Sequence, residues 1–365
     1  MIGGSVGLAA RERLEGATVR GFDPSARALE RALERGAIDE RCDSVEEAAR
    51  GADVCFVCCP VGVLGDAVGR TLAAGGEAAI SDVGSTKHAV LESVRTGTRP
   101  EQETSRFIGG HPLAGAEATG VEHARADLFD GAVWYLTPTE RTSGIHYERL
   151  YRAISSMGAR PSAISSETHD RLMATVSHLP HVLANVLVSQ AARALLEEEQ
   201  GLPATGPSFR DATRVAGANP GLWRDIFVTN REAIETELDS YVAALESVRD
   251  DLRAGRGAEI ARWIEGARAD RQRLLETELA GGPVAELRIS VPNRPGIVAA
   301  VALALGEAGL NIVDMALYPA PDMRSGAIAV WVSGEREAER ALGLVAELGY
   351  PAAVVEDGGE PGSRS

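Results

Sequence analysis

The 365-residue chain lacks any run of about 18 uncharged apolar residues, so the sequence predicts no membrane-spanning helix. Charged residues at positions 11–13 and 15 exclude the apolar core of a signal peptide. Basic residues are scarce, since 37 Lys and Arg face 53 Asp and Glu, a formal net charge of −16. Nonspecific nucleic-acid binding needs the opposite sign and is not expected. A small anionic ligand would need a local cluster of cations to offset this charge.

Cysteine and lysine are also rare. The four cysteines are Cys42, Cys55, Cys58 and Cys59, and the last three share one apolar run, VCFVCCP. A disulfide framework would spread them along the chain, so this clustering indicates a reducing cytoplasm and small buried core residues. Cys55 and Cys58 would point to opposite faces of a strand, which argues against a shared metal. The only lysine is Lys87.

Three segments differ in hydrophobic periodicity. In residues 1–165, short apolar runs alternate with helical patterns, which predicts a doubly wound α/β sheet of the Rossmann type. Residues 166–280 show helical spacing throughout, with a kink expected at Pro180. Such long apolar stripes are expected to pack against each other or against a partner subunit in a homodimer. Residues 285–357 follow the order β, α, β, β, α, β of a ferredoxin-like fold. The tail 358–365 is expected to be disordered.

The first residues resemble the end of a dinucleotide-binding fingerprint. Gly3, Gly4 and Ser5 precede a helical pattern, and Asp23 ends the next strand, where an acid would accept the ribose hydroxyls of NAD. Because Arg27 lies nearby in the sequence, NADP stays open as an alternative cofactor. The first strand and first two glycines of such a fingerprint are missing, which would leave the sheet without a central member. We therefore expect the stated start to lie roughly 8 to 10 residues downstream of the true one.

Two motifs follow predicted strand ends, where ligands bind in parallel sheets. SDVGSTKHAV carries Ser85 and Thr86, which could also simply cap a helix. FIGGHPLAGAEATG carries His111, and its flanking glycines and Pro112 place it in a constrained loop rather than in an ordinary structural position. The sequence thus favours a functional histidine at this edge.

Two further motifs lie in the helical segment. SHLPH places His178 and His181 three residues apart, and FRDATRVAGANPGLWRDIF places Arg210 and Arg214 four apart, so each pair is expected on one helix face. Paired arginines offer bidentate contacts to carboxylates. As bare patterns both could be solvated faces. A metal is not expected at the histidines because no third ligand is evident nearby.

Taken in this order, DVGSTK, GGHPLAGAE, SHLPH and FRDATR…LWRDIF resemble the prephenate dehydrogenase family from Gly3 to about residue 280. The segment NRPGIVAAVALALGEAGLNI resembles an ACT domain, a small amino-acid-binding regulatory module. The resemblance implies NAD-dependent oxidation and decarboxylation of prephenate to 4-hydroxyphenylpyruvate in tyrosine biosynthesis, in a cytoplasmic enzyme. Aromatisation drives the reaction, so no metal is required.

The resemblance also implies roles for individual residues. His111 would hold the substrate hydroxyl as hydride leaves, Ser85 would orient this histidine and touch nicotinamide, Arg214 would bind the substrate carboxylate, and His181 would reach the pyruvyl side chain. The residues that would gate or shape the site are Glu117, Arg210, Asp211 and Trp223. The family often carries lysine where this chain has Arg210, so the positive charge is kept but the shape of the cationic group differs.

The ACT resemblance implies that tyrosine binds as an effector. The residues expected at this site are Asn293, Pro295, Gly296, Asn311 and Ile312. A purely structural dimerisation module remains an alternative for this segment.

Three rival functions stay open. Arogenate dehydrogenase would perform the same chemistry on an amine-bearing side chain. A β-hydroxyacid dehydrogenase would use a lysine base on the helical domain, where this chain has none, because Lys87 is its only lysine. A non-catalytic amino-acid sensor would combine an ACT module with a defective dehydrogenase, an idea supported by the missing first strand.

Overall fold

The computed structural model describes residues 1–97, 104–115, 119–196, 206–277, 284–320 and 325–355. The chain forms two compact units. The first comprises Met1–Asp170 together with Pro283–Ser365, and the second comprises Arg171–Gly282. The tail predicted at 358–365 lies outside the described residues.

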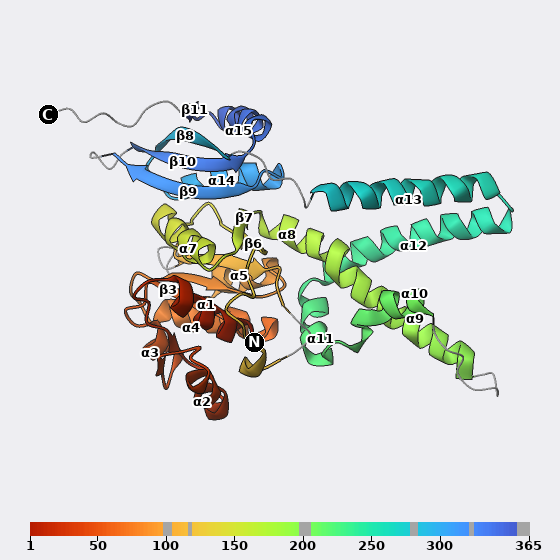
Figure 1. The fold of residues 1–365 in the computed structure, drawn as a ribbon, viewed down its shortest axis with the longest axis horizontal. Helices are drawn as coiled ribbons and strands as arrows, with labels where there is room; N and C mark the ends of the chain where they lie inside the picture. Colours follow the sequence, from red (N-terminus) through yellow and green to blue (C-terminus); the bar gives the residue numbers. More distant parts are fainter. Residues whose placement is uncertain (98–103, 116–118, 197–205, 278–283, 321–324, 356–365) are drawn as a thin grey trace. The chain divides into compact units, whose positions relative to one another are not determined.

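The N-terminal part of the first unit alternates strands and helices along the chain (Figure 1). Its elements are α1 (Ile2–Arg13), β1 (Arg20–Gly21), α2 (Ala26–Glu34), β2 (Glu40–Arg41), α3 (Val45–Ala49), β3 (Val54–Val57), α4 (Val61–Ala73), β4 (Ala79–Asp82), α5 (His88–Thr96), β5 (Phe107–Pro112), η1 (Val121–His123), β6 (Val133–Thr137), α7 (Gly144–Ser156) and β7 (Arg160–Ala163). Helix α8 (Ser166–Met173) crosses from the first unit into the second.

The strands form two separate sheets. β1 pairs with β2, and the other sheet has the order β3-β4-β5-β6-β7. Among the described residues no strand joins β1 to β3, so each is an edge strand of its own sheet. The four residues of edge strand β3 are only half buried, whereas all four of β4 are buried.

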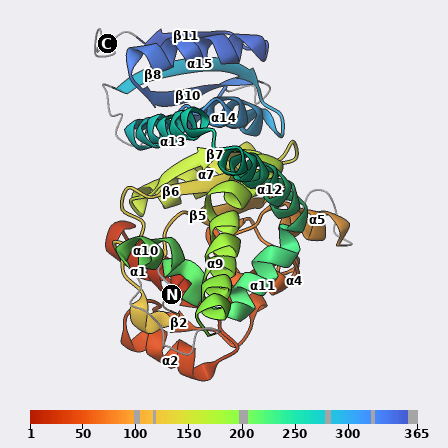
Figure 2. The ribbon, with the colours of Figure 1, turned by 90° about the vertical axis from the view of Figure 1, so that its right-hand side faces the viewer.

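Helices cover both faces of the larger sheet. α4 and α5 pack on one face, where Leu64, Leu72 and Ile80 are fully buried. α1 and α7 pack on the other, and α7 contacts β3, β4 and β7 (Figures 1 and 2). The buried Trp134 of β6 belongs to this second core. This confirms the predicted doubly wound layers.

The sheet is not parallel throughout, in contrast to the sequence-based expectation. β3, β4 and β5 run parallel, but β6 pairs with β5 antiparallel, with Gly109 opposite Thr137. Strand β7 is parallel to β6. Parallel neighbours need a crossover helix, and the described chain between β5 and β6 contains only the short 3₁₀ turn η1.

The C-terminal part of the first unit is the predicted βαββαβ fold. Its elements are β8 (Val284–Pro292), α14 (Ile297–Glu307), β9 (Ile312–Pro319), β10 (Ser325–Ser333), α15 (Glu335–Glu347) and β11 (Ala352–Val355). The antiparallel sheet has the order β11-β8-β10-β9. Leu287 of β8, Val330 of β10 and Val345 of α15 are fully buried between sheet and helices.

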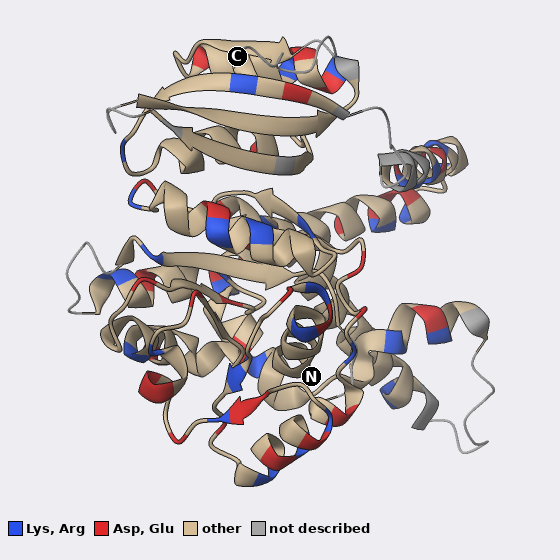
Figure 3. Cartoon of the chain, turned by 60° about the vertical axis from the view of Figure 1, so that its left-hand side comes forward, with Lys and Arg blue, Asp and Glu red and all other residues tan. Residues whose placement is uncertain are grey.

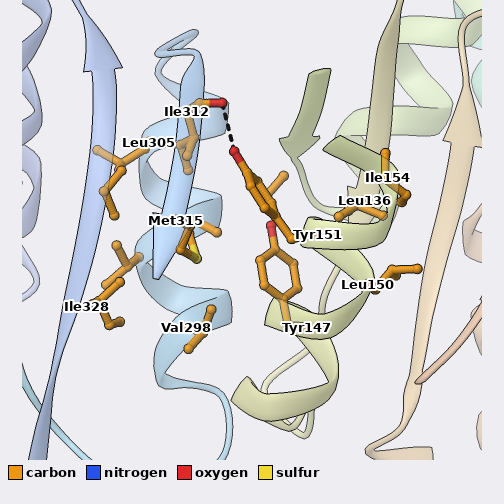
Figure 4. Packing of buried hydrophobic residues seen from close by; sticks show 14 of the residues in the cluster. Leu136, Tyr147, Leu150, Tyr151, Ile154, Val298, Leu305, Ile312, Met315 and Ile328 are labelled. Atoms are coloured by element: carbon orange, nitrogen blue, oxygen red, sulfur yellow. Dashed lines mark hydrogen bonds between the residues drawn. The ribbon is translucent and has the colours of Figure 1, made fainter. Parts of the chain in front are cut away.

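This C-terminal domain packs directly on the nucleotide domain within the first unit. The buried Tyr147 and Tyr151 of α7 share a core with Val298 of α14 and Met315 of β9 (Figure 4). The Tyr151 hydroxyl donates a hydrogen bond to the carbonyl oxygen of Ile312 at 3.0 Å. The two domains therefore have one continuous apolar core, which the division by periodicity did not predict.

The second unit is helical throughout its described residues, as predicted. It contains the π-helical turn η2 (Ala174–His178), α9 (Leu179–Leu196), α10 (Pro207–Thr213), the 3₁₀ turn η3 (Arg214–Gly217), α11 (Pro220–Thr229), α12 (Arg231–Arg253) and α13 (Gly257–Thr277). α12 and α13 form a long antiparallel pair (Figure 1).

The expected disturbance at Pro180 takes the form of η2. Proline lacks the N–H that would bond back to the carbonyl oxygen of Val176 and its ring crowds that oxygen, so the preceding turn widens. The helical run Ser166–Ala194 is long and apolar enough, by length and composition, to cross a membrane, with a hydropathy of 1.3 over its most apolar window. Residues 172–192 of this run hold no Asp, Glu, Lys or Arg but include polar residues such as Ser177, His178 and Asn185, so the run is not apolar throughout.

Charged residues of both signs are interspersed over the elements in view in Figure 3. Of the four cysteines, Cys42 is buried as expected, but Cys58 is exposed because it follows the end of β3. The expectation of a buried core role is wrong for Cys58.

Candidate active site

The end of β5 is fitted tightly between β4 and β6, and glycine is required there. A Cβ on Gly109 would collide with the Thr137 hydroxyl. A Cβ on Gly110 would lie 2.7 Å from the Asp82 carbonyl oxygen and 3.0 Å from Trp134 Nε1. The two glycines thus let β5 approach its neighbours. His111 lies near the carboxyl end of the strand, opposite Tyr135 of β6, so the expectation of a loop position is wrong.

The only lysine holds this strand end in place. Lys87 and Asp82 are both fully buried and form an ion pair. Lys87 Nζ also donates to the Gly110 carbonyl oxygen at 2.7 Å, and Asp82 Oδ1 accepts from Gly110 N at 3.0 Å. Burial lowers the pKa of Lys87, while the adjacent Asp82 carboxylate opposes that shift. The pair fixes the backbone immediately before His111.

Behind His111 lies a short chain of hydrogen-bonded side chains. His111 Nδ1 is 2.9 Å from Nε2 of His169, and His169 Nδ1 is 2.7 Å from Oδ1 of Asp170. His169 and Asp170 lie within α8 and are buried, whereas His111 is partly exposed. The His169 ring also lies edge-on to His111 and to Tyr135, with centroids 5.1 and 5.8 Å away.

Asp170 is held at the beginning of α5. Its Oδ1 accepts from Lys87 N at 2.7 Å, and its Oδ2 accepts from His88 N at 2.9 Å. Neither His169 nor Asp170 was predicted from the sequence, because ETHDRL has the pattern of an ordinary helix start. The available signal was the adjacent His-Asp pair in the first helix after β7.

The capping alternative for Ser85 and Thr86 is wrong. Helix α5 begins at His88. Its N-cap residue is Lys87, whose side chain makes no capping hydrogen bond. Asp170 instead binds the first N–H groups. Ser85 is half buried in the turn after β4, and its expected contact with nicotinamide stays a prediction.

The expected nucleotide-binding residues lie at the start of α1 and the end of β1. Gly4 lies against η1, where a Cβ would come within 2.9 Å of Val121 and Ala124. The Ser5 hydroxyl is buried and accepts a hydrogen bond from Arg125 N at 3.0 Å, so this side chain links α1 to the segment after η1.

Gly3 is exposed, and a Cβ there would come 3.0 Å from Cys58 Cβ. Asp23 is exposed, and its Oδ1 accepts from Ser25 N at 2.8 Å. The first turn of α1 and this acid remain available to a ligand.

The second unit brings two predicted residues together. The rings of His181 and Trp223 are stacked with centroids 3.4 Å apart and an interplanar angle of 24°. His178 lies edge-on to the same indole at 5.9 Å. The Asn230 amide donates to His178 Nδ1 at 3.0 Å, so His178 is held by the beginning of α12. The His181 ring is therefore placed by aromatic packing.

The two arginines do not share one continuous helix. Arg210 is in the last turn of α10, which ends at Thr213, and Arg214 begins η3. The expectation of one helix face for the pair is wrong because the winding changes between them. Arg214 and Asp211 are exposed, and η3 packs on α9, the helix that carries His181. Glu117 lies outside the described residues.

The expected effector residues lie at two opposite ends of the C-terminal sheet, because Pro292, next to Asn293, pairs with Ser325 of β10 whereas Ile312 pairs with Val332. Gly296 caps α14 with φ +81°, and its N–H donates to the Thr142 carbonyl oxygen of the nucleotide domain at 3.0 Å. Pro295 directly precedes this cap. Asn293 follows β8, and Asn311 directly precedes β9, which begins at Ile312.

In the part of the chain that the structure describes, no three His, Cys, Asp or Glu side chains gather as metal ligands. The side chains at the end of β5 can donate and accept protons. The nearby glycine-containing start of α1 can receive a phosphate group.

Comparisons with known proteins agree with this arrangement. Residues 6–162 match the prephenate dehydrogenase nucleotide-binding domain, residues 165–266 the prephenate dehydrogenase dimerization domain, and residues 285–344 the ACT domain. The prephenate dehydrogenase of Bacillus subtilis (strain 168) is 28% identical over 347 residues, which cover 93% of this chain and 92% of that protein.

A cyclohexadienyl dehydrogenase of Zymomonas mobilis is 32% identical over 253 residues, covering 68% of this chain and 84% of that protein. The crystal structure of prephenate dehydrogenase from A. aeolicus, in complex with hydroxyphenyl propionate and NAD+, superposes with a TM-score of 0.66 at 26% identity. That match covers 75% of this chain and 94% of the other. The chain belongs to the prephenate dehydrogenase family and carries a C-terminal ACT domain.

Proposed function

We propose that the chain oxidises and decarboxylates prephenate to 4-hydroxyphenylpyruvate with NAD+. The observation that carries the proposal is His111, held at the end of β5 by the Lys87–Asp82 pair and hydrogen-bonded to His169. Family membership supplies the reaction class, and this partly exposed imidazole beside a nucleotide domain supplies an acceptor for a substrate hydroxyl.

The residues at the start of α1 fit a dinucleotide. Gly3 is exposed in the first turn of α1, and the N–H groups of such a turn bind a pyrophosphate. Asp23 after β1 suits the adenosine ribose hydroxyls and favours NAD, while Arg27 keeps NADP as the less favoured choice. Bound NAD+ supplies the hydride acceptor.

The chain's own residues would supply the remaining chemistry. As hydride leaves the carbinol carbon, positive charge builds on the substrate hydroxyl, and His111 accepts a hydrogen bond from it. The carboxylate then departs as CO2, the electrons of that bond complete the aromatic ring, and the hydroxyl proton is on the phenol at the end of the reaction. Arg214 would bind a substrate carboxylate and His181, stacked on Trp223, would contact the pyruvyl group.

Appearance of NADH on addition of prephenate tests this function. Prephenate should be turned over with a higher kcat/KM than arogenate, because a histidine at 181 suits a keto group. The reverse preference would make arogenate dehydrogenase the correct function. Turnover of neither substrate, with NAD binding absent as well, would support the amino-acid sensor.

The ACT domain leads us to propose tyrosine as an effector. The loop that carries Asn293 and Gly296 binds the nucleotide domain through the Gly296–Thr142 hydrogen bond, so a ligand there would be linked to the catalytic domain. Tyrosine should lower the rate with prephenate, and an unchanged rate would favour a structural role for the domain. A homodimer in the cytoplasm completes the proposal.

A further inference from the structure

We propose that His169 and Asp170 are positioning residues that fix the tautomer of His111 and support positive charge on its ring. The proposal rests on the role of His111 given above. Its basis is the continuous chain from His111 through His169 to Asp170, with distances of 2.9 and 2.7 Å.

The protonation pattern can be followed from Asp170 outwards. Its carboxylate faces three donors, namely the backbone N–H groups of Lys87 and His88 and the imidazole of His169. The two backbone groups can only donate, so both oxygens of Asp170 act as acceptors. A carboxylate in this position at the start of α5 is also favoured by the helix dipole. Asp170 therefore takes its proton-accepting, anionic form.

The acceptor role of Asp170 fixes the neighbouring ring. His169 Nδ1 must carry the proton that it donates to Asp170. Burial is the main factor that lowers the pKa of His169, so the ring is neutral near pH 7 and its Nε2 holds a lone pair. Asp170 opposes this shift, and the Lys87 cation reinforces it.

His111 is fixed in turn. Its Nδ1 must carry the proton donated to His169 Nε2, so the lone pair lies on Nε2 of His111. That tautomer is the one that can accept a hydrogen bond from the substrate hydroxyl through Nε2. In the opposite tautomer of His111, Nε2 would point an N–H at the substrate hydroxyl. Its Nδ1 lone pair would then face the lone pair on Nε2 of His169.

The hydrogen-bonded series His111–His169–Asp170, called the relay below, also acts as positive charge develops on the substrate hydroxyl. While hydride leaves, the hydroxyl proton shifts toward His111 Nε2, and the resulting imidazolium is stabilised through His169 by the Asp170 anion. When CO2 has left and the ring is aromatic, the proton returns to the phenolic oxygen. No proton is gained or lost overall, so the relay needs no connection to solvent.

The first test is Asp170→Asn, which replaces one of two accepting oxygens by a donor. Three N–H donors then compete for a single oxygen, and His169 loses its fixed tautomer. We expect kcat to fall about 100-fold with little change in KM. The acid limb of the kcat/KM profile should move to lower pH, because protonated His111 loses its supporting anion.

A pair of substitutions at His169 separates hydrogen bonding from packing. His169→Gln can donate to Asp170 and accept from His111, so it should keep kcat within about tenfold of the wild type. His169→Phe keeps a ring beside Tyr135 but cannot do either, and should lose activity as strongly as Asp170→Asn. Equal activity of the two variants would overturn the proposal.

Loss of a helix cap needs its own control, since Asp170 also binds the start of α5. Ser44→Ala removes the side-chain cap of α3, whose hydroxyl accepts from Glu47 N at 3.1 Å, and should leave kcat and the pH profile unchanged. If Asp170→Asn leaves kcat and the acid limb at wild-type values, the relay is overturned.

A measurement without turnover keeps the proposal distinct from the function. In the wild-type full chain, ¹⁵N NMR of the imidazole rings should show a protonated Nδ1 and an unprotonated Nε2 in His111 and in His169 near pH 7. The opposite tautomer of His111 would overturn the relay even if prephenate is the substrate. Correct tautomers without prephenate turnover would contradict only the proposed function.

Discussion

At the scale of single residues, His111 differs from the other histidines in being partly exposed while its Nδ1 contacts a buried imidazole. His178, by contrast, is buried and bound by Asn230, a structural arrangement. The sequence motif alone pointed to both. The distinction follows from what surrounds each ring, since a proton acceptor for a substrate needs one nitrogen fixed by the protein.

His111→Asn should lower kcat with prephenate by about 100- to 10,000-fold, because an amide is a poor proton acceptor. Arg214→Ala should mainly raise KM, because it removes a carboxylate partner. Steady-state kinetics with NAD titrations checks both, and NAD affinity should be unchanged in each. A fully active His111→Asn would remove this histidine from the proposed acid–base role.

His146 leads to a prediction on stability. Burial, followed by the nearby Arg149 cation, lowers the pKa of His146 in the folded chain below its ordinary value of 6.5. Between these two pKa values the unfolded chain binds the proton and the folded chain does not, so stability falls as the pH falls below about 6.5.

Urea unfolding near pH 7.5 and near pH 5.5 measures this loss. His146→Gln should reduce it, because the amide does not titrate. An equal loss in the wild type and the variant would show that His146 does not contribute.

At the scale of elements, glycines determine how closely helices and strands approach each other. Gly110 brings β5 against β4, and Gly306 brings α14 against β7. The run GGHP signalled the first of these in the sequence. Gly306 lies within an apolar helix without any motif, so the need for glycine there became visible only in the packed structure.

Gly306→Ala should destabilise the chain by about 2 kcal/mol, because its Cβ would collide with the Ala163 carbonyl oxygen. Gly343→Ala is the matched control in α15, where no atom lies within 4 Å of the added Cβ. That change should stabilise by about 0.5–1 kcal/mol through helix propensity. Thermal or urea unfolding compares the two, and equal effects would contradict the close packing of α14 on β7.

At the scale of the whole molecule, the second unit exposes many apolar side chains. Val186, Leu187 and Val188 of α9 are each more than a third exposed. Its residues match a dimerization domain, so a second copy of the chain is the natural cover for this surface. The same exposed helix accounts for a hydropathy high enough to suggest a membrane span.

Light scattering coupled to size-exclusion chromatography should therefore give about twice the 38.4 kDa of one chain. Val186→Asp places a charge on this surface and should shift the protein to monomers. Val63→Asp, on the exposed side of α4 in the first unit, is the control and should remain dimeric. A monomeric wild type would contradict the prediction.

The amino-acid sequence by itself determined the succession of strands and helices, the three kinds of domain and the family, because periodicity and motifs are local along the chain. The tertiary structure alone decided which side chains meet. His111 contacts His169 across 58 residues, and Asp170 binds the N–H of Lys87 across 83. Such contacts depend on the order and direction of strands and on where helices begin, which only the packing of the whole sheet determines.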